Sequence, residues 1–139
     1  MPITKMGNYG DVRVTKLGFD RALIQLEASL KKEGFGVLCQ IDIQAKLKEK
    51  LGVDFSRYVI LGVCNPPLAH QALQADMNLG LLLPCNAVVY EKGGVVHIGV
   101  IDAVRMLSVA DNPEMESMAQ QVNEKLRRAL DSVTAHPAA

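Results

Sequence analysis

Residues 86–101 read NAVVYEKGGVVHIGVI, and this stretch decides the fold. Two runs rich in β-branched residues, 86–90 and 95–101, flank the tetrapeptide Glu91-Lys92-Gly93-Gly94. The paired glycines permit the positive φ angles that a tight hairpin needs. The stretch therefore predicts two antiparallel strands joined by a short turn.

Other strands are expected upstream of this hairpin. Residues 57–64 read RYVILGVC and are almost wholly apolar, which is typical of a central strand covered on both faces or buried in a subunit contact. The two prolines that follow end the strand, because neither can donate to a sheet ladder. Residues 35–41 predict a further strand, and Val12 and Val14 alternate with charged neighbours as in a short half-buried strand.

Four helices are expected between and after these strands. Asp42 and Asn112 are suited to cap two helices at their N-termini, and Gly34 and Gly52 to end two at their C-termini. The apolar residues recur at three- and four-residue spacing, which predicts buried stripes. These stripes are Phe19, Leu23, Leu26 and Leu30; Ala45, Leu47 and Leu51; Ala69, Ala72, Leu73 and Met77; and Met115, Met118, Ala119, Val122, Leu126, Ala129 and Val133.

The length of 139 residues fits one domain over residues 1–139. We expect an ordered core over 11–133 and flexible ends over 1–10 and 134–139. Lys and Arg number 15, as do Asp and Glu, and the chain has three Phe, three Tyr and no Trp. Nucleic acid is not expected as a partner, because there is no net positive charge and little aromatic surface.

The location of the protein is expected to be cytoplasmic, without a membrane partner. Residues 1–5 lack the basic segment and apolar run of a secretion signal, and the longest apolar runs are too short to span a bilayer. An odd count of three cysteines without dense spacing argues against a disulfide scaffold.

Two short motifs predict a site. Cys64-Asn65-Pro66-Pro67 and Pro84-Cys85-Asn86 each stand where an apolar run meets a turn. If the two strands pair antiparallel, the end of one lies beside the start of the other, and the two thiols become neighbours. A helix starting near the prolines is expected to lower the pKa of a nearby thiol, and the two Asn amides are expected to orient a ligand.

Histidine adds a possible metal ligand, because Zn²⁺ takes thiolate and imidazole. His70 stands one helical turn past Pro66, so Cys64, Cys85 and His70 are the candidate ligands, one short of a closed tetrahedral site. His97 is expected on a sheet surface or an interface, where it is a candidate general base. Cys39 lies within a strand and is interpreted as packing.

Three functions remain open on these residues. The first is a binding module that holds a small ligand or a soft metal between the two motifs. The second is a thiol-dependent redox or transfer enzyme that uses Cys64 and Cys85. The third is a structural or protein-interaction domain, because buried Cys often acts as a small hydrophobe and Asn beside Pro is ordinary turn chemistry.

The chain also resembles the bacterial and archaeal "domain of unknown function 302" family. The resemblance is carried by YVILGVCNP at residues 58–66, Leu68-Ala69, and GLLLPCN at residues 80–86, and runs from about Val12 to the final helix. It implies an α+β fold, similar to the TATA-binding-protein-like β-α-β(4)-α arrangement, with helices on one face of an antiparallel sheet of four to five strands. It also implies a homodimer, and neither a settled activity nor DNA binding. The positions that match the family pattern are Cys64, Asn65, Pro66, Pro84, Cys85 and Asn86.

Overall fold

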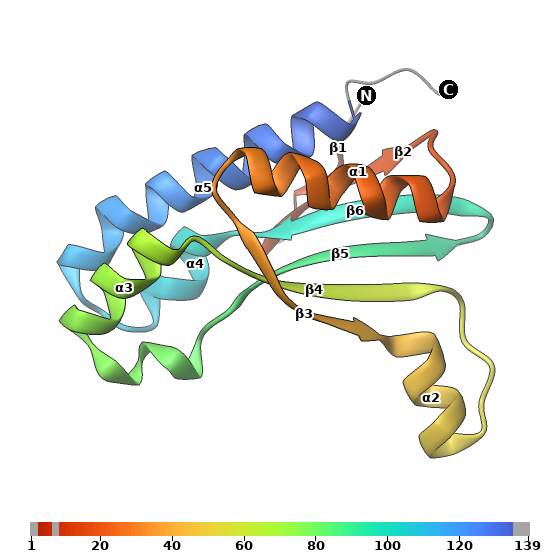
Figure 1. Ribbon diagram of the computed structural model, residues 1–139, viewed down its shortest axis with the longest axis horizontal. Helices are drawn as coiled ribbons and strands as arrows, with labels where there is room; N and C mark the ends of the chain where they lie inside the picture. The colour runs from red at the N-terminus through yellow and green to blue at the C-terminus, as the bar shows by residue number, and fades with distance from the viewer. Residues whose placement is uncertain (1–2, 7–8, 135–139) are drawn as a thin grey trace.

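The computed structural model describes residues 3–6 and 9–134, the first four by their backbone alone. Its centre is an antiparallel sheet of six strands in the order β1-β2-β6-β5-β4-β3 (Figure 1). The strands are β1 (Ile3–Met6), β2 (Gly10–Thr15), β3 (Gly36–Asp42), β4 (Tyr58–Cys64), β5 (Cys85–Lys92) and β6 (Val95–Ile101). The predicted α+β class is confirmed. The sheet has one strand more than expected, because β1 lies within residues 1–10, where a flexible end was predicted. Of the rest of the two predicted flexible ends, the structure describes residues 9, 10 and 134; the other residues lie outside the described part of the chain.

Two long helices form one layer on the sheet, and shorter helices lie at both ends of the molecule (Figure 1). Helices α1 (Phe19–Lys32) and α5 (Pro113–Thr134) lie over the same face of the sheet. Helix α3 (Pro66–Ala75), the 3-10 helix η1 (Met77–Leu81) and helix α4 (Ala103–Ser108) lie at one end. Helix α2 (Ile43–Leu51) projects from the opposite end. The expectation that helices pack on one face of the sheet therefore holds for α1 and α5. None of the described helices is long and apolar enough to cross a bilayer.

Local signals fixed the turns and helix ends as expected. Gly93 and Gly94 have φ angles of 59° and 76°, and they join β5 to β6 as the predicted hairpin. The Asp42 carboxylate accepts a hydrogen bond from the Ala45 amide at 2.9 Å, and Gly52 ends α2 with a φ of 68°. The Asn112 side chain likewise accepts from the Glu114 amide at 3.0 Å. These devices depend only on residues close in sequence, so the sequence predicts them well.

The core lies between α1, α5 and one face of the sheet. Val59, Leu61 and Val63 of β4 are buried in it, whereas Tyr58 and Ile60 point to the other face and are half-buried. The prediction that this strand is covered on both faces is therefore wrong for the isolated chain, because α1 and α5 cover only one side. The apolar stripe of α2 also lacks a cover, since α2 contributes no buried residue. Met77 is 81% exposed, since α3 ends before it.

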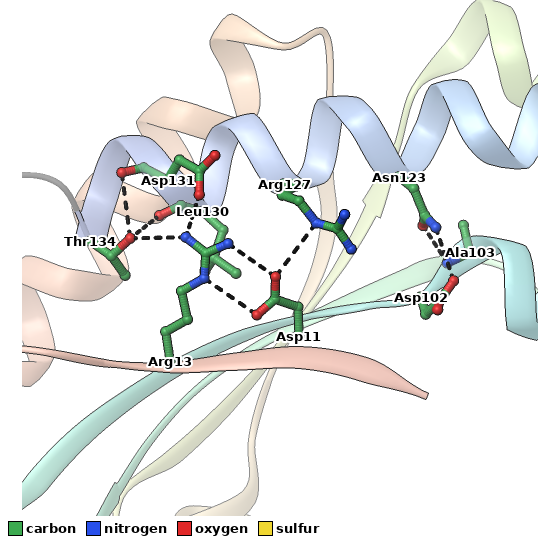
Figure 2. A network of polar contacts seen from close by, with 9 residues as sticks. All are labelled: Asp11, Arg13, Asp102, Ala103, Asn123, Arg127, Leu130, Asp131 and Thr134. Atoms are coloured by element: carbon green, nitrogen blue, oxygen red, sulfur yellow. Dashed lines mark hydrogen bonds and ion pairs between the residues drawn. The ribbon is translucent and has the colours of Figure 1, made fainter. Parts of the chain in front are cut away.

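A buried ion network ties the C-terminal end of α5 to β2 (Figure 2). The Arg13 guanidinium pairs with Asp11 at 3.0 Å and with Asp131, and it donates to the Thr134 hydroxyl at 3.2 Å. Burial opposes the charge of Arg13, but the two carboxylates outweigh it and raise its pKa. The network fixes the position of the last helical turn over the sheet.

Candidate functional site

The two cysteine motifs meet at one end of the sheet. Strands β4 and β5 pair antiparallel with Val63 opposite Cys85, so β4 ends where β5 begins. The residues between them form α3 and η1, an excursion that leaves the sheet and returns (Figure 1). The structure thus brings Cys64 and Cys85 to the wall of one cavity of about 280 Å³. We call this hollow the thiol cavity.

The thiol cavity is lined almost entirely by apolar groups. Helix α3 forms one wall, the chain from η1 into β5 forms a second, and α4 and α5 close the far side. Cys64, Cys85 and Asn65 supply the polar atoms among the side chains. The lining residues are Phe35, Leu38, Val63, Cys64, Asn65, Leu68, Ala69, Ala72, Leu73, Gly80, Leu83, Pro84, Cys85, Leu107, Met118 and Val122.

Asn65 caps the N-terminus of α3. Its side-chain oxygen accepts from the Leu68 amide at 3.4 Å, which caps the helix, and its side-chain nitrogen donates to the Glu33 carbonyl at 3.5 Å. A Cβ at Gly34, whose φ is 88°, would lie 3.0 Å from that nitrogen. Both ends of the amide are engaged in holding the chain, so Asn65 positions the cavity wall rather than offering free groups to a ligand.

Pro84 packs against the strand at Gly62. A Cβ at Gly62 would lie 2.9 Å from the Pro84 ring and 2.6 Å from the Cys39 sulfur, so only glycine fits between them. Cys39 itself is exposed, which contradicts its interpretation as buried packing. The reason is that β3 is an edge strand, and all seven of its residues are exposed.

Both thiols of the cavity are neutral at physiological pH. Cys85 is 7% exposed, and burial, with a smaller contribution from nearby Cys64, raises its pKa to about 11. Burial also raises the pKa of Cys64, which is half-buried. The expected lowering by the start of α3 is wrong, because the loss of hydration outweighs any effect of the helix end. Thiolate chemistry is therefore disfavoured in this state.

The other predicted site residues lie elsewhere. Pro66 and His70 are exposed on α3, outside the lining of the thiol cavity. Within residues 3–6 and 9–134, no three His, Cys, Asp or Glu side chains gather in a way that could hold a metal ion. The predicted set of Cys64, Cys85 and His70 is therefore not assembled, since the helix directs His70 to solvent.

Asn86 lies on the opposite face of the sheet from Cys85. It lines a groove of about 600 Å³ together with Tyr58, Tyr90 and His97. Successive residues of a strand point to opposite faces, so the neighbours Cys85 and Asn86 are separated by the sheet. This alternation was a signal in the sequence, and the prediction that both side chains serve one pocket overlooked it. The groove residues Tyr58 and Tyr90 were also missed.

A second polar cluster supports α4. Asp102 caps this helix by accepting from the Arg105 amide at 3.1 Å. It also accepts from the Asn123 side chain at 2.9 Å, as Figure 2 shows. Burial opposes the charge of Asp102, but these hydrogen bonds and the charge of Arg105 outweigh it and lower its pKa. The arrangement is complete without a ligand, so it serves structure.

Comparisons with known proteins agree with this description. Residues 11–133 match the model of the family described as "Domain of unknown function DUF302". The crystal structure of an uncharacterized conserved protein DUF302 from Bacillus stearothermophilus is similar, with a TM-score of 0.84 and 35% sequence identity over 89% of this chain and 97% of that chain. No match was found among curated proteins. The family match covers most of the chain and is joined by a closely similar fold, so this chain belongs to the DUF302 family.

Proposed function

We propose that this protein is a cytoplasmic homodimeric binding module that holds a small, mostly apolar molecule in the thiol cavity. The observation that carries the proposal is the gathering of both cysteine motifs around one apolar hollow. Ligand sites are concave and largely apolar, with a few polar groups that fix orientation. The thiol cavity has that composition, with Cys64 and Cys85 as its orienting groups.

The size of the cavity limits the ligand. Its volume of about 280 Å³ accommodates roughly ten non-hydrogen atoms if each takes about 30 Å³, the share of one water molecule in the liquid. Neutral thiols are weak hydrogen-bond partners, so affinity must come mainly from burial of apolar surface. A series of primary alcohols from butanol to decanol is a suitable probe. We expect affinity to rise about fourfold for each methylene group and to level off when the chain fills the cavity.

A cavity-filling substitution tests the location. Ala69 lies on the α3 wall, and Ala69→Phe places a ring in the hollow. Gln71→Phe is the matched control, because Gln71 is exposed on the same helix. Calorimetric titration with octanol should show binding to the wild type and to Gln71→Phe, and at least a tenfold loss, about 1.4 kcal/mol, in Ala69→Phe. Octanol that neither binds nor raises the melting temperature of any of the three proteins contradicts the proposal.

A second candidate is reversible thiol chemistry. It is favoured by the closeness of Cys64 and Cys85, which is sufficient for one to affect the pKa of the other. Oxidised glutathione would convert the two thiols to a disulfide and release two molecules of reduced glutathione. Native protein that loses two hydrogen atoms on this treatment, while Cys64→Ala and Cys85→Ala do not, supports this chemistry.

Soft-metal binding by the same pair is tested separately. Added Cu(I) alone should raise the melting temperature of the wild type and leave that of Cys64→Ala unchanged if the two sulfurs hold it. Protein that is inert to octanol, glutathione and Cu(I) alike favours the third function, a structural or interaction domain.

The proposed dimer rests on apolar surface that this chain leaves uncovered. The segment from β3 through α2 to residue 55 exposes Leu38, Leu51, Val53 and Phe55 by 65%, 68%, 44% and 46%. Large apolar side chains exposed in this number within one segment are typical of an interaction site. We call residues 36–55 the arm, and a second copy of the chain is its proposed cover.

A further inference from the structure

The face of the sheet opposite α1 and α5 carries a second hollow. Its floor is the row Val12, Gly99 and Val88, which pair across β2, β6 and β5. Gly99 has no side chain, and a Cβ there would lie 3.0 Å from a Val12 methyl and 3.4 Å from a Val88 methyl. The two methyl groups close in on Gly99, and no side chain rises from this position, so the floor is flat here. The resulting groove has a volume of about 600 Å³, and we call it the tyrosine groove.

A ladder of rings forms one wall of the tyrosine groove. Tyr58, Tyr90 and His97 are opposite one another on β4, β5 and β6. Their centroids are 5.2 Å and 4.7 Å apart, with interplanar angles of 10° and 3°. Because the rings stack face to face across three strands, they present their edges along the strand direction. Ring edges carry partial positive charge and attract electron-rich groups.

The polar groups of the groove favour a negative charge. Lys92 supplies a cation, and Tyr9, Tyr58 and Tyr90 supply phenolic hydroxyls. None of the described lining residues is Asp or Glu. Burial raises the pKa of Tyr58 and of Tyr90, so both phenols keep their protons and remain donors. His97 Nδ1 lies 3.2 Å from the Val95 carbonyl and donates to it, so Nε2 of the neutral ring is an acceptor and the anion is paired by Lys92 and the phenols.

From this geometry we infer that the tyrosine groove is a second binding site, specific for a small planar aromatic molecule that carries an anionic group. The flat floor at Gly99 selects planar ligands, the ring edges select an electron-rich π system, and Lys92 with the phenols pairs the anion. The site is separated from the thiol cavity by the thickness of the sheet, so the two bind independently.

The chain offers an internal reporter for this groove. It contains three tyrosines and no Trp, and all three tyrosines line the groove. Intrinsic emission therefore comes from the proposed site, and its quenching by a bound aromatic probe reports occupancy there. The probe is 2-naphthoate, with affinities measured in parallel by calorimetry.

Three comparisons of probes and variants test the chemistry. 2-Naphthoate should bind at least about fivefold more tightly than its saturated analogue decahydro-2-naphthoate and than the uncharged 2-naphthamide. Lys92→Gln should weaken naphthoate about fivefold and leave naphthamide unchanged, as expected for a charge pair near the surface. Lys31→Gln is the matched control, because it removes an exposed lysine from α1 on the other side of the sheet.

The ladder is tested by Tyr90→Leu, which should abolish naphthoate binding while Ala69→Phe, the thiol-cavity variant, binds it as the wild type does. Should Tyr90→Leu fail to fold, the Lys92→Gln comparison still decides. Three results would overturn the inference: no quenching by millimolar naphthoate, equal affinity for the saturated analogue, or a dimer that dissociates in Tyr90→Leu, which would show that a second copy covers this face. None of these results bears on octanol binding in the thiol cavity.

Discussion

At the scale of single residues, burial decides the pKa of the Cys64 thiol and of the Cys85 thiol. The location of the pair follows from antiparallel pairing of β4 and β5, which the sequence predicts. The direction of their pKa shifts does not follow from the sequence, because it depends on burial. Part of the cavity wall, Met118 and Val122, comes from a helix far along the chain. Desolvation by such distant neighbours raises a thiol pKa whatever the local motif.

The raised pKa of Cys85 predicts a fall in stability at alkaline pH. The folded state keeps the Cys85 proton up to a pH of about 11, whereas the unfolded chain loses it near a pH of about 9. The folded state thus binds more protons between these values, so its free energy of unfolding is unaffected below pH 9 and falls as pH rises toward 11. The loss is about 3 kcal/mol for a shift of this size.

Urea denaturation at pH 8, 9, 10 and 11 measures this effect. The difference between wild type and Cys85→Ala should shrink as pH rises, because the variant lacks the titrating group. Cys39→Ala is the matched control, since Cys39 is exposed. A constant difference between wild type and Cys85→Ala across this range would show that Cys85 is not desolvated.

At the scale of elements, sequence patterns located helices and strands better than their surroundings. The caps at Asp42 and Asn112 and the hairpin glycines act on residues close by in the chain. The local sequence is therefore sufficient to predict them. The burial of an apolar stripe is not local. Helix α5 buries its stripe against α1 and the sheet, while α2 has a comparable spacing and buries nothing. The difference lies in where the topology puts each helix.

The buried network at Arg13 is also a property of packing between elements, and it predicts a specific loss. Arg13→Met leaves Asp11, which is almost fully buried, with Arg127 at 3.6 Å as its remaining cationic partner among the side chains that the structure describes. Removing one partner of a buried ion pair costs about 3 kcal/mol. We expect a loss of that size in the free energy of unfolding, with faster hydrogen exchange in the last turns of α5.

The control for this prediction is an exposed ion pair on the same helix. Arg128→Met breaks the pair with Glu33 at 3.0 Å and should cost less than about 1 kcal/mol. The double variant Asp11→Leu with Arg13→Met should recover part of the loss, because it removes the buried carboxylate together with its partner. Equal losses in Arg13→Met and Arg128→Met would show that the network does not hold α5.

At the scale of the whole molecule, the sheet divides the chemistry between two faces. The sequence predicted one site because both motifs stand at strand ends, yet Cys85 faces the helices and Asn86 faces the tyrosine groove. The ring ladder arises from register across three strands, with Tyr58, Tyr90 and His97 in one row. Register follows from pairing, which a reading of separate segments does not supply.

The last prediction concerns formation of a dimer through the arm. An uncovered helix and edge strand are poorly stabilised in one copy, because few of their apolar groups leave water. If a second copy covers the arm, sedimentation velocity at micromolar concentration should show a dimer, and α2 amides should exchange more slowly as protein concentration rises.

Leu51→Asp should yield monomer, because it places a charge in the proposed contact. Met77→Asp, at an even more exposed apolar residue outside the arm, should remain dimeric. A monomeric wild type, or exchange of α2 that does not depend on concentration, would rule out the arm as the dimer contact.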